Sequence, residues 1–337
     1  MTVRFVPSPF VPAWWLPGPH FQTLGARFLR PASGVALYRE RVELPDGDFV
    51  DLDFSFDGRR PGAGADRRPV VLVLHGLEGS ARSRYALEMY RALGERGLAG
   101  VGLNFRSCSG ELNRLPRMYH SGDTADLQFV LQLLSERFSD RPRGVIGFSL
   151  GGNAMLKFLG DMGERALVRV RAAAAVSVPY DLSAGADHLV RPGGWVYTSF
   201  LLRKLRRKVH AKRAIMPPTV DVERALAAKT FREFDDAATA PLHDFRGAED
   251  YYRRASSAWV IDKIRVPTLL LHAADDPFQP GSCIPTAAAR DNPHIVSGFT
   301  ETGGHVGFVA RSVPTAPVFW AEREVARFMA EMLCPPS

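Results

Sequence analysis

The feature that most constrains this chain is an alternation of short apolar runs with segments of helical periodicity. The apolar runs are rich in Val and Leu and lack polar alternation, which is typical of parallel strands buried on both faces. Because parallel strands need helical crossovers between them, this order predicts a mostly parallel sheet flanked by helices. The predicted strands are 69–75, 98–105, 144–148, 170–178, 266–274 and 294–300, and the predicted helices are 84–96, 124–137, 152–159 and 318–333.

Three segments fall outside this alternation. Residues 1–34 are rich in Pro, Trp and Phe, too irregular for a helix, and predict an N-terminal arm. The turn Asp46-Gly47 between two strand patterns predicts a β-hairpin at the start of the core. Residues 181–262 carry helical patterns without a buried strand and predict a helical cap inserted over the strand ends. The core is therefore expected over 35–180 and 263–337.

The most specific motif is Gly147-Phe148-Ser149-Leu150-Gly151, which directly follows a predicted strand and precedes a helix. A serine at so tight a turn adopts a strained backbone, and the residues two before and two after it must be small. This geometry lifts the hydroxyl of Ser149 above the sheet and points the helix N-terminus at developing negative charge. The motif predicts an α/β-hydrolase fold with Ser149 as nucleophile.

A serine nucleophile needs a base and an acid that orients the base, and in this fold they follow in the order Ser, acid, His. Of the later histidines, only His305 lies in a loop of small residues after the last predicted strand, so we expect it to be the base. The acid should follow the penultimate strand, where Asp275 and Asp276 stand. Asp276 is preferred because a proline follows four residues later. Asp275 and, after the preceding strand, Asp181 remain alternatives.

The other histidines are expected to be structural. His272 lies within a predicted buried strand and is expected to be a core histidine with satisfied hydrogen bonds. His188, His210 and His243 belong to the predicted cap and are expected at its surface.

The backbone predicts two donors for the oxyanion of an acyl-transfer reaction. One is the N–H of Leu150, and the other is the N–H of Leu77 in the loop His75-Gly76-Leu77-Glu78-Gly79. Together these residues predict a serine hydrolase that cleaves carboxylic esters through an acyl-enzyme. The apolar cap favours medium-to-long acyl or lipid-like esters. An alcohol acyltransferase would use the same residues, the triad also permits a protease or amidase, and a catalytically silent binding protein is a further alternative.

Composition narrows the classes of partner. The net charge is +7 and the pI is near 9.5, but the arginines are spread along the chain without a recognised module, so we expect no nucleic-acid partner. Three widely spaced cysteines indicate neither a disulfide framework nor a metal site, and the predicted chemistry implies no cofactor. The N-terminus does not resemble a signal peptide and no apolar run reaches the length of a spanning helix, so a cytoplasmic location is expected. The oligomeric state stays open.

Five strings of the chain are distinctive: PGPHFQTL (17–24), LNFRSCSGELNRLPRMYHSGDTAD (103–126), HGLEGS, GFSLGGN and AADDPF. They resemble those of YheT-like α/β-hydrolases, and the resemblance covers roughly residues 17–310. It implies an esterase or lipid-ester hydrolase, in some members an acyltransferase, with the triad on Ser149, the Asp275/Asp276 pair and His305. The chain departs from the family at Ser107, where glycine is usual, and at Gly18, where asparagine is common.

Two further segments carry hypotheses with alternatives. Arg106, His120 and Asp123 follow a predicted strand at the same edge as Ser149, and they form either a polar network under the site or ordinary loop structure. Residues 195–213 set an aromatic and aliphatic half against a dense basic half. That pattern predicts either peripheral contact with an acidic membrane surface or a helix packed on the core with its basic face in solvent.

Overall fold

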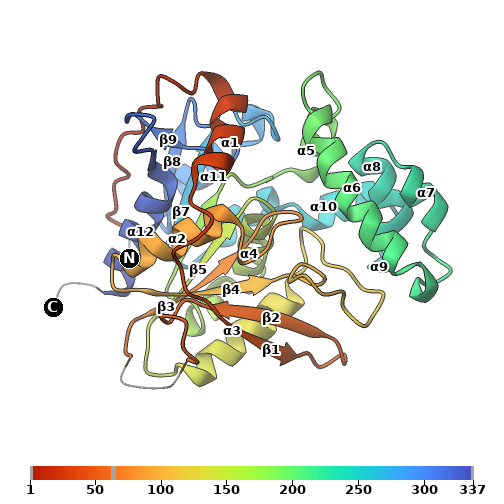
Figure 1. Cartoon of the computed structure of the whole chain (residues 1–337), viewed down its shortest axis with the longest axis horizontal. Coiled ribbons are helices and arrows are strands. Elements are labelled where there is room, and N and C mark those ends of the chain that lie inside the picture. Colours follow the sequence, from red (N-terminus) through yellow and green to blue (C-terminus); the bar gives the residue numbers. More distant parts are fainter. Residues whose placement is uncertain (1–2, 62–65, 335–337) are drawn as a thin grey trace.

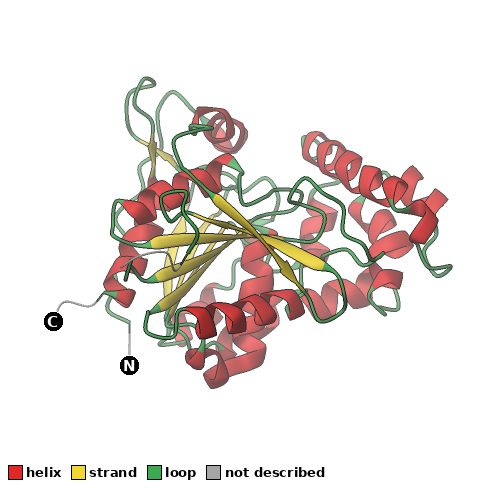
Figure 2. Cartoon of the chain, turned by 60° about the horizontal axis from the view of Figure 1, so that its bottom comes forward, coloured by secondary structure: helices red, strands yellow, loops and turns green. Residues whose placement is uncertain are grey.

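An eight-stranded sheet forms the centre of the structure, a computed structural model that describes residues 3–61 and 66–334. The strand order is β1-β2-β4-β3-β5-β6-β7-β8, in which β3 to β8 run parallel and the β1–β2 hairpin joins β4 antiparallel (Figure 2). The predicted hairpin and the predicted mostly parallel sheet are confirmed. The strands are β1 (Tyr38–Glu43), β2 (Phe49–Phe54), β3 (Val70–Leu74), β4 (Ala99–Asn104), β5 (Arg143–Phe148), β6 (Ala172–Val176), β7 (Thr268–Ala273) and β8 (Ile295–Thr300), with a separate pair β9 (Val309–Ala310) and β10 (Val318–Phe319).

Alternate residues of the central strands face two separate apolar cores. In β3, Leu72 and Leu74 belong to one buried cluster, whereas Val71 and Val73 belong to the other. The continuous apolar sequence of this strand therefore follows from burial on both faces. The first core is covered by α3 (Ala125–Arg137), α4 (Leu150–Met162) and α11 (Thr286–Asp291), and the second by α2 (Arg84–Gly94) and α12 (Trp320–Leu333).

Six short to medium helices between β6 and β7 gather at one side of the sheet (Figure 1). Residues 181–262 contain helices and no strand. The apolar face of α6 is buried through Leu202, Leu205 and Val209, which pack on the neighbouring helices α7 and α8. In the aromatic and aliphatic half of the 195–213 segment, Trp195, Val196 and Phe200 remain exposed. The helices are α5 (Leu182–His188), α6 (Trp195–Ala211), α7 (Val222–Ala227), α8 (Phe231–Phe234), α9 (Ala240–Leu242) and α10 (Ala248–Ala255), with a π-helical turn over Asp235–Thr239.

The prediction that residues 1–34 are too irregular for a helix is wrong, because Gly18–Leu29 form α1. Pro19 occupies the first turn, where its missing N–H is not needed. The buried face of α1 consists of Gln22 and Ala26, whereas Phe21, Leu24 and Phe28 are exposed. A helix that buries a polar and a small side chain lacks the apolar stripe by which helices are recognised in a sequence.

Buried Arg106 connects the β1–β2 hairpin to the core through ion pairs. The guanidinium of Arg106 forms ion pairs with three carboxylates, those of Asp46, Asp48 and Asp126. The first two belong to the β1–β2 turn and the third to the first turn of α3, so the cluster joins elements far apart in the sequence. Asp123 pairs instead with Arg117 at 2.9 Å. The hypothesis that Arg106 and Asp123 share one network under the site is therefore wrong.

Replacing this arginine should destabilise the fold. We expect Arg106→Met to lower the free energy of unfolding by about 3 kcal/mol, because it leaves buried carboxylates without a cation. Urea denaturation followed by circular dichroism measures the change. The matched control is Arg67→Met, since Arg67 is exposed and pairs with exposed Asp140, and we expect a loss below about 1 kcal/mol. Equal losses in the two variants would contradict the assigned role.

Candidate active site

The turn between β5 and α4 holds Ser149 in a left-handed backbone conformation, with φ of 51°. Its neighbours leave no space for a side chain. A Cβ on Gly147 would lie 2.4 Å from Cα of Gly152, and one on Gly151 would lie 2.6 Å from the carbonyl oxygen of His75. Both positions therefore require glycine, as the sequence motif predicts.

The structure brings Ser149, His305 and Asp276 together across three separate loops. Nε2 of His305 lies 2.9 Å from Oγ of Ser149, and Nδ1 lies 2.8 Å from Oδ2 of Asp276. With its proton on Nδ1, the imidazole donates to the carboxylate and presents the Nε2 lone pair to the serine hydroxyl. This arrangement allows proton transfer from Ser149 to His305.

The two adjacent aspartates point in different directions. Oδ1 of Asp275 accepts a hydrogen bond from the backbone N–H of Gly304 at 2.9 Å. Asp181 caps α5 by accepting from the N–H of Ala184. Of the three candidate acids, all within the described chain, only Asp276 contacts the ring of His305.

The carboxylate of Asp276 is 2% exposed and held on both oxygens. Burial acts to raise its pKa, but the charge and hydrogen bond of His305 outweigh this effect and hold the pKa below its usual range. Its second oxygen accepts from the N–H of Phe278 at 2.8 Å. Nε2 of His272 lies 3.8 Å from Oδ2 of Asp276.

His272 does not match the expectation of a core histidine with satisfied hydrogen bonds. It is buried in β7, but within the described residues neither ring nitrogen has a hydrogen-bond partner. Burial lowers its pKa to about 4, so the ring is neutral at physiological pH. A neutral His272 adds no positive charge to compete with His305 for Asp276.

The N-terminal helix α1 holds the loop that carries His305. Oγ1 of Thr23 accepts a hydrogen bond from the backbone N–H of His305 at 2.9 Å. Buried Gln22 bonds both the N–H and the carbonyl of Val309 on the far side of the loop. Gly304 is so close to α1 that a Cβ there would lie 2.5 Å from the carbonyl oxygen of Pro19. The PGPHFQTL string therefore has a physical role, which pattern reasoning did not assign.

The loop after β3 leaves one backbone donor free. The N–H of Gly76 donates to Tyr85 Oη and the N–H of Glu78 to Tyr119 Oη. Between them, the N–H of Leu77 has no acceptor within the described residues. Leu77 and Leu150 both line the cavity next to Ser149. Both predicted oxyanion donors therefore lie at the site, one in this loop and one at the N-terminus of α4.

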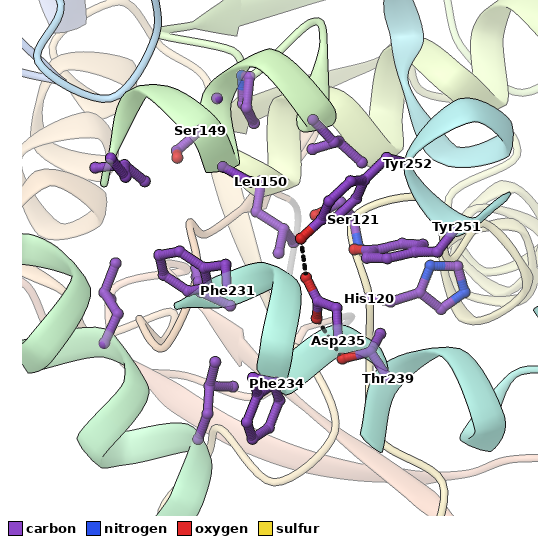
Figure 3. Close-up of a pocket in the computed structure, with 18 of the residues that line it drawn as sticks. His120, Ser121, Ser149, Leu150, Phe231, Phe234, Asp235, Thr239, Tyr251 and Tyr252 are labelled. Atoms are coloured by element: carbon purple, nitrogen blue, oxygen red, sulfur yellow. Dashed lines mark hydrogen bonds between the residues drawn. The ribbon is translucent and has the colours of Figure 1, made fainter. Parts of the chain in front are cut away.

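An apolar cavity of about 120 Å³ opens beside Ser149 under the helices between β6 and β7 (Figure 3). Its walls are mostly aliphatic and aromatic, which suits a hydrocarbon chain better than a charged group. The apolar lining includes Leu77, Leu150, Leu182, Leu201, Leu205, Phe231 and Phe234.

A carboxyl group interrupts this apolar wall. Asp235 accepts hydrogen bonds from the hydroxyls of Tyr252 and Thr239, at 2.7 and 2.6 Å (Figure 3). Burial raises the pKa of Asp235 to about 6, although both hydroxyls act to lower it. His243 lines the same cavity with its ring 4.4 Å from that of His120, so the expectation that His243 lies at the surface is wrong. No local motif marks Asp235, because its position depends on how short helices pack.

Comparison with known proteins shows the family of this chain. Residues 69–312 match the family described as alpha/beta hydrolase fold. The chain is 38% identical to YheT of Escherichia coli (strain K12), over 96% of this chain and 94% of that protein. It is 30% identical to phospholipase ABHD3 of Bos taurus, over 97% of this chain and 80% of that protein.

The chain belongs to the α/β-hydrolase family, in the group of YheT. Because these relatives are named as an esterase and a phospholipase, this α/β-hydrolase is a carboxylic ester hydrolase. The structure of the Pyrococcus furiosus esterase Pf2001 superposes with a TM-score of 0.55 at 15% identity, over 97% of this chain and 100% of that chain, which shows the shared fold. Within the described part of the α/β-hydrolase, no helix combines the length and apolar character needed to cross a membrane.

The contact between α1 and the His305 loop can be tested directly. We expect Thr23→Val to lower kcat for an ester by about tenfold, because the N–H of His305 loses its acceptor and the imidazole loses its fixed position. Thr23→Ser keeps the hydroxyl and should retain most of the activity. Steady-state kinetics on p-nitrophenyl hexanoate compares the variants. Wild-type kcat in Thr23→Val would contradict the positioning role of α1.

Proposed function

We propose that this α/β-hydrolase cleaves carboxylic esters with medium-to-long acyl chains, using Ser149 as nucleophile, His305 as base and Asp276 as orienting acid. The observation that carries the proposal is the pair of hydrogen bonds at Nε2 and Nδ1 of His305, 2.9 Å to Ser149 and 2.8 Å to Asp276. YheT, named as an esterase, and ABHD3, named as a phospholipase, support ester chemistry. The apolar cavity beside Ser149 supports a hydrocarbon acyl group.

In the proposed mechanism, His305 takes the proton of Ser149 while Oγ attacks the ester carbonyl. The backbone N–H groups of Leu77 and Leu150 stabilise the oxyanion of the tetrahedral intermediate. Asp276 keeps the imidazole in its productive tautomer and stabilises the imidazolium. His305 then protonates the leaving alcohol, and the same steps with water release the acid and restore Ser149.

An ester series tests this proposal. With p-nitrophenyl esters from acetate to dodecanoate, we expect kcat/KM for hexanoate to exceed that for acetate by at least about tenfold, because each buried methylene contributes about 0.8 kcal/mol. Ser149→Ala should lower kcat by at least about 10⁴-fold. Turnover that persists in Ser149→Ala would contradict the assignment of the nucleophile.

The adjacent aspartates supply a matched control in the same assay. Asp276→Asn should lower kcat by about 10⁴-fold, because an amide supports the wrong tautomer of His305. Asp275→Asn keeps the size of the side chain and changes only the acceptor for the N–H of Gly304, so the loss should stay below about tenfold. The reverse order would transfer the role of acid to Asp275.

A further inference from the structure

A second and larger compartment of about 670 Å³ lies next to Ser149. It shares Ser149, His305, Leu77 and Phe278 with the apolar cavity, so the reacting atoms stand between the two spaces. Its remaining walls come from α1, the loop after β3, the start of α2, and α6. The mechanism proposed above assigns no role to this compartment.

The compartment carries three cations that have no carboxylate partner. Arg82 and Arg30 also line it, but they are paired with Asp53 and Glu322. Among the described residues, no carboxylate lies within ion-pair distance of the remaining three cations in the lining, Arg27, Arg84 and Lys204. Their observed contacts are to neutral groups: Arg84 donates to the carbonyls of Phe28 and Arg30, and Lys204 donates to the carbonyl of Glu78.

The one acidic side chain in the described lining of the compartment, that of Glu78, already has a cationic partner. Glu78 is 8% exposed, and its carboxylate binds Nζ of Lys208 at 2.6 Å and the hydroxyl of Tyr119 at 2.9 Å. The compartment therefore keeps an excess of positive charge beside the reacting serine. An anion that enters it meets cations without displacing an existing partner.

Two of these cations contact the same aromatic ring. The guanidinium of Arg27 and the ammonium of Lys204 lie over the same ring, that of Phe200, at 4.9 and 5.0 Å from its centroid. Burial lowers the pKa of Lys204, whereas the charge of Glu78 raises it and the charge of Arg27 lowers it. Because the charge of Arg27 is unfavourable for that of Lys204, an anion bound in the compartment would reduce the repulsion.

We propose that this compartment binds the leaving alcohol of the ester and that this alcohol carries an anionic phosphate group. The inference rests on the proposed function, in which the acyl chain fills the apolar cavity and His305 protonates the alcohol oxygen. The alcohol then leaves into the compartment that His305, Arg27 and Lys204 line together. Guanidinium and ammonium groups bind phosphate by charge-assisted hydrogen bonds, and a net anion suits this lining better than a zwitterion or a neutral glycerol.

Three matched esters test the proposal, namely 1-hexanoyl-glycerol, 1-hexanoyl-glycero-3-phosphocholine and 1-hexanoyl-glycerol 3-phosphate, each assayed as monomers. We expect kcat/KM to rise in that order, with the phosphate ester at least about tenfold above the neutral ester. The double variant Arg27→Gln/Lys204→Gln should lose about tenfold on the phosphate ester and less than about threefold on the neutral one. Arg203→Gln, next to Lys204 but outside the compartment, is the control and should change neither value.

The outcomes separate this proposal from the proposed function. Hydrolysis of all three esters at similar rates leaves the esterase assignment intact and overturns the phosphate site. Hydrolysis of none of them by folded protein overturns both. If the preference appears only with phosphatidylglycerol vesicles and not with monomeric phosphate ester, the cations act on a lipid surface and the proposal is wrong. Inhibition of neutral-ester hydrolysis by inorganic phosphate as strongly as by glycerol 3-phosphate would mean a free-anion site and would also overturn it.

Discussion

The left-handed backbone of Ser149 is the constraint on which the rest of the site depends. A non-glycine residue in this conformation costs about 1–3 kcal/mol, so the surroundings must hold it in place. The N–H of Ser149 donates to the carbonyl of Val176 in the next strand, and its own carbonyl accepts from the N–H of Asn153. The backbone of Gly76 approaches so closely that a Cβ there would lie 3.1 Å from Cβ of Ser149. Leu77, the next residue, lines the same cavity as Ser149.

Contacts between residues far apart in the sequence position the proposed base and the basic compartment. Thr23 and His305 are 282 residues apart in the chain, yet α1 holds the loop of the proposed base. The helix also supplies Arg27 to the basic compartment, while α6 supplies Lys204 and the ring between them. The proposed catalytic geometry and the proposed recognition of the leaving group therefore both depend on α1. The direct hydrogen bond between His20 of α1 and Tyr197 of α6, at 2.8 Å, joins these elements at the edge of the site.

Much of the fold and site follows from local rules that a sequence displays. Strands buried on both faces must be apolar throughout, and a serine in a strained turn needs the small neighbours Gly147 and Gly151. Other features depend on packing that no local pattern encodes. The buried residues of α1 are Gln22 and Ala26, which do not make an apolar stripe that a sequence pattern displays. The choice between Asp275 and Asp276 depends on which side chain turns toward Gly304. Asp235 reaches the cavity only through the arrangement of the short helices around it.

A crystal structure of the protein after reaction with p-nitrophenyl hexylphosphonate, whose serine adduct mimics the tetrahedral intermediate, tests the proposed mechanism most directly. We expect phosphorus bonded to Oγ of Ser149, with one phosphonyl oxygen about 3 Å from the backbone nitrogens of both Leu77 and Leu150. The hexyl chain should lie in the apolar cavity beside Phe231 and Phe234. An adduct on another residue, or a phosphonyl oxygen that contacts neither nitrogen, would contradict it.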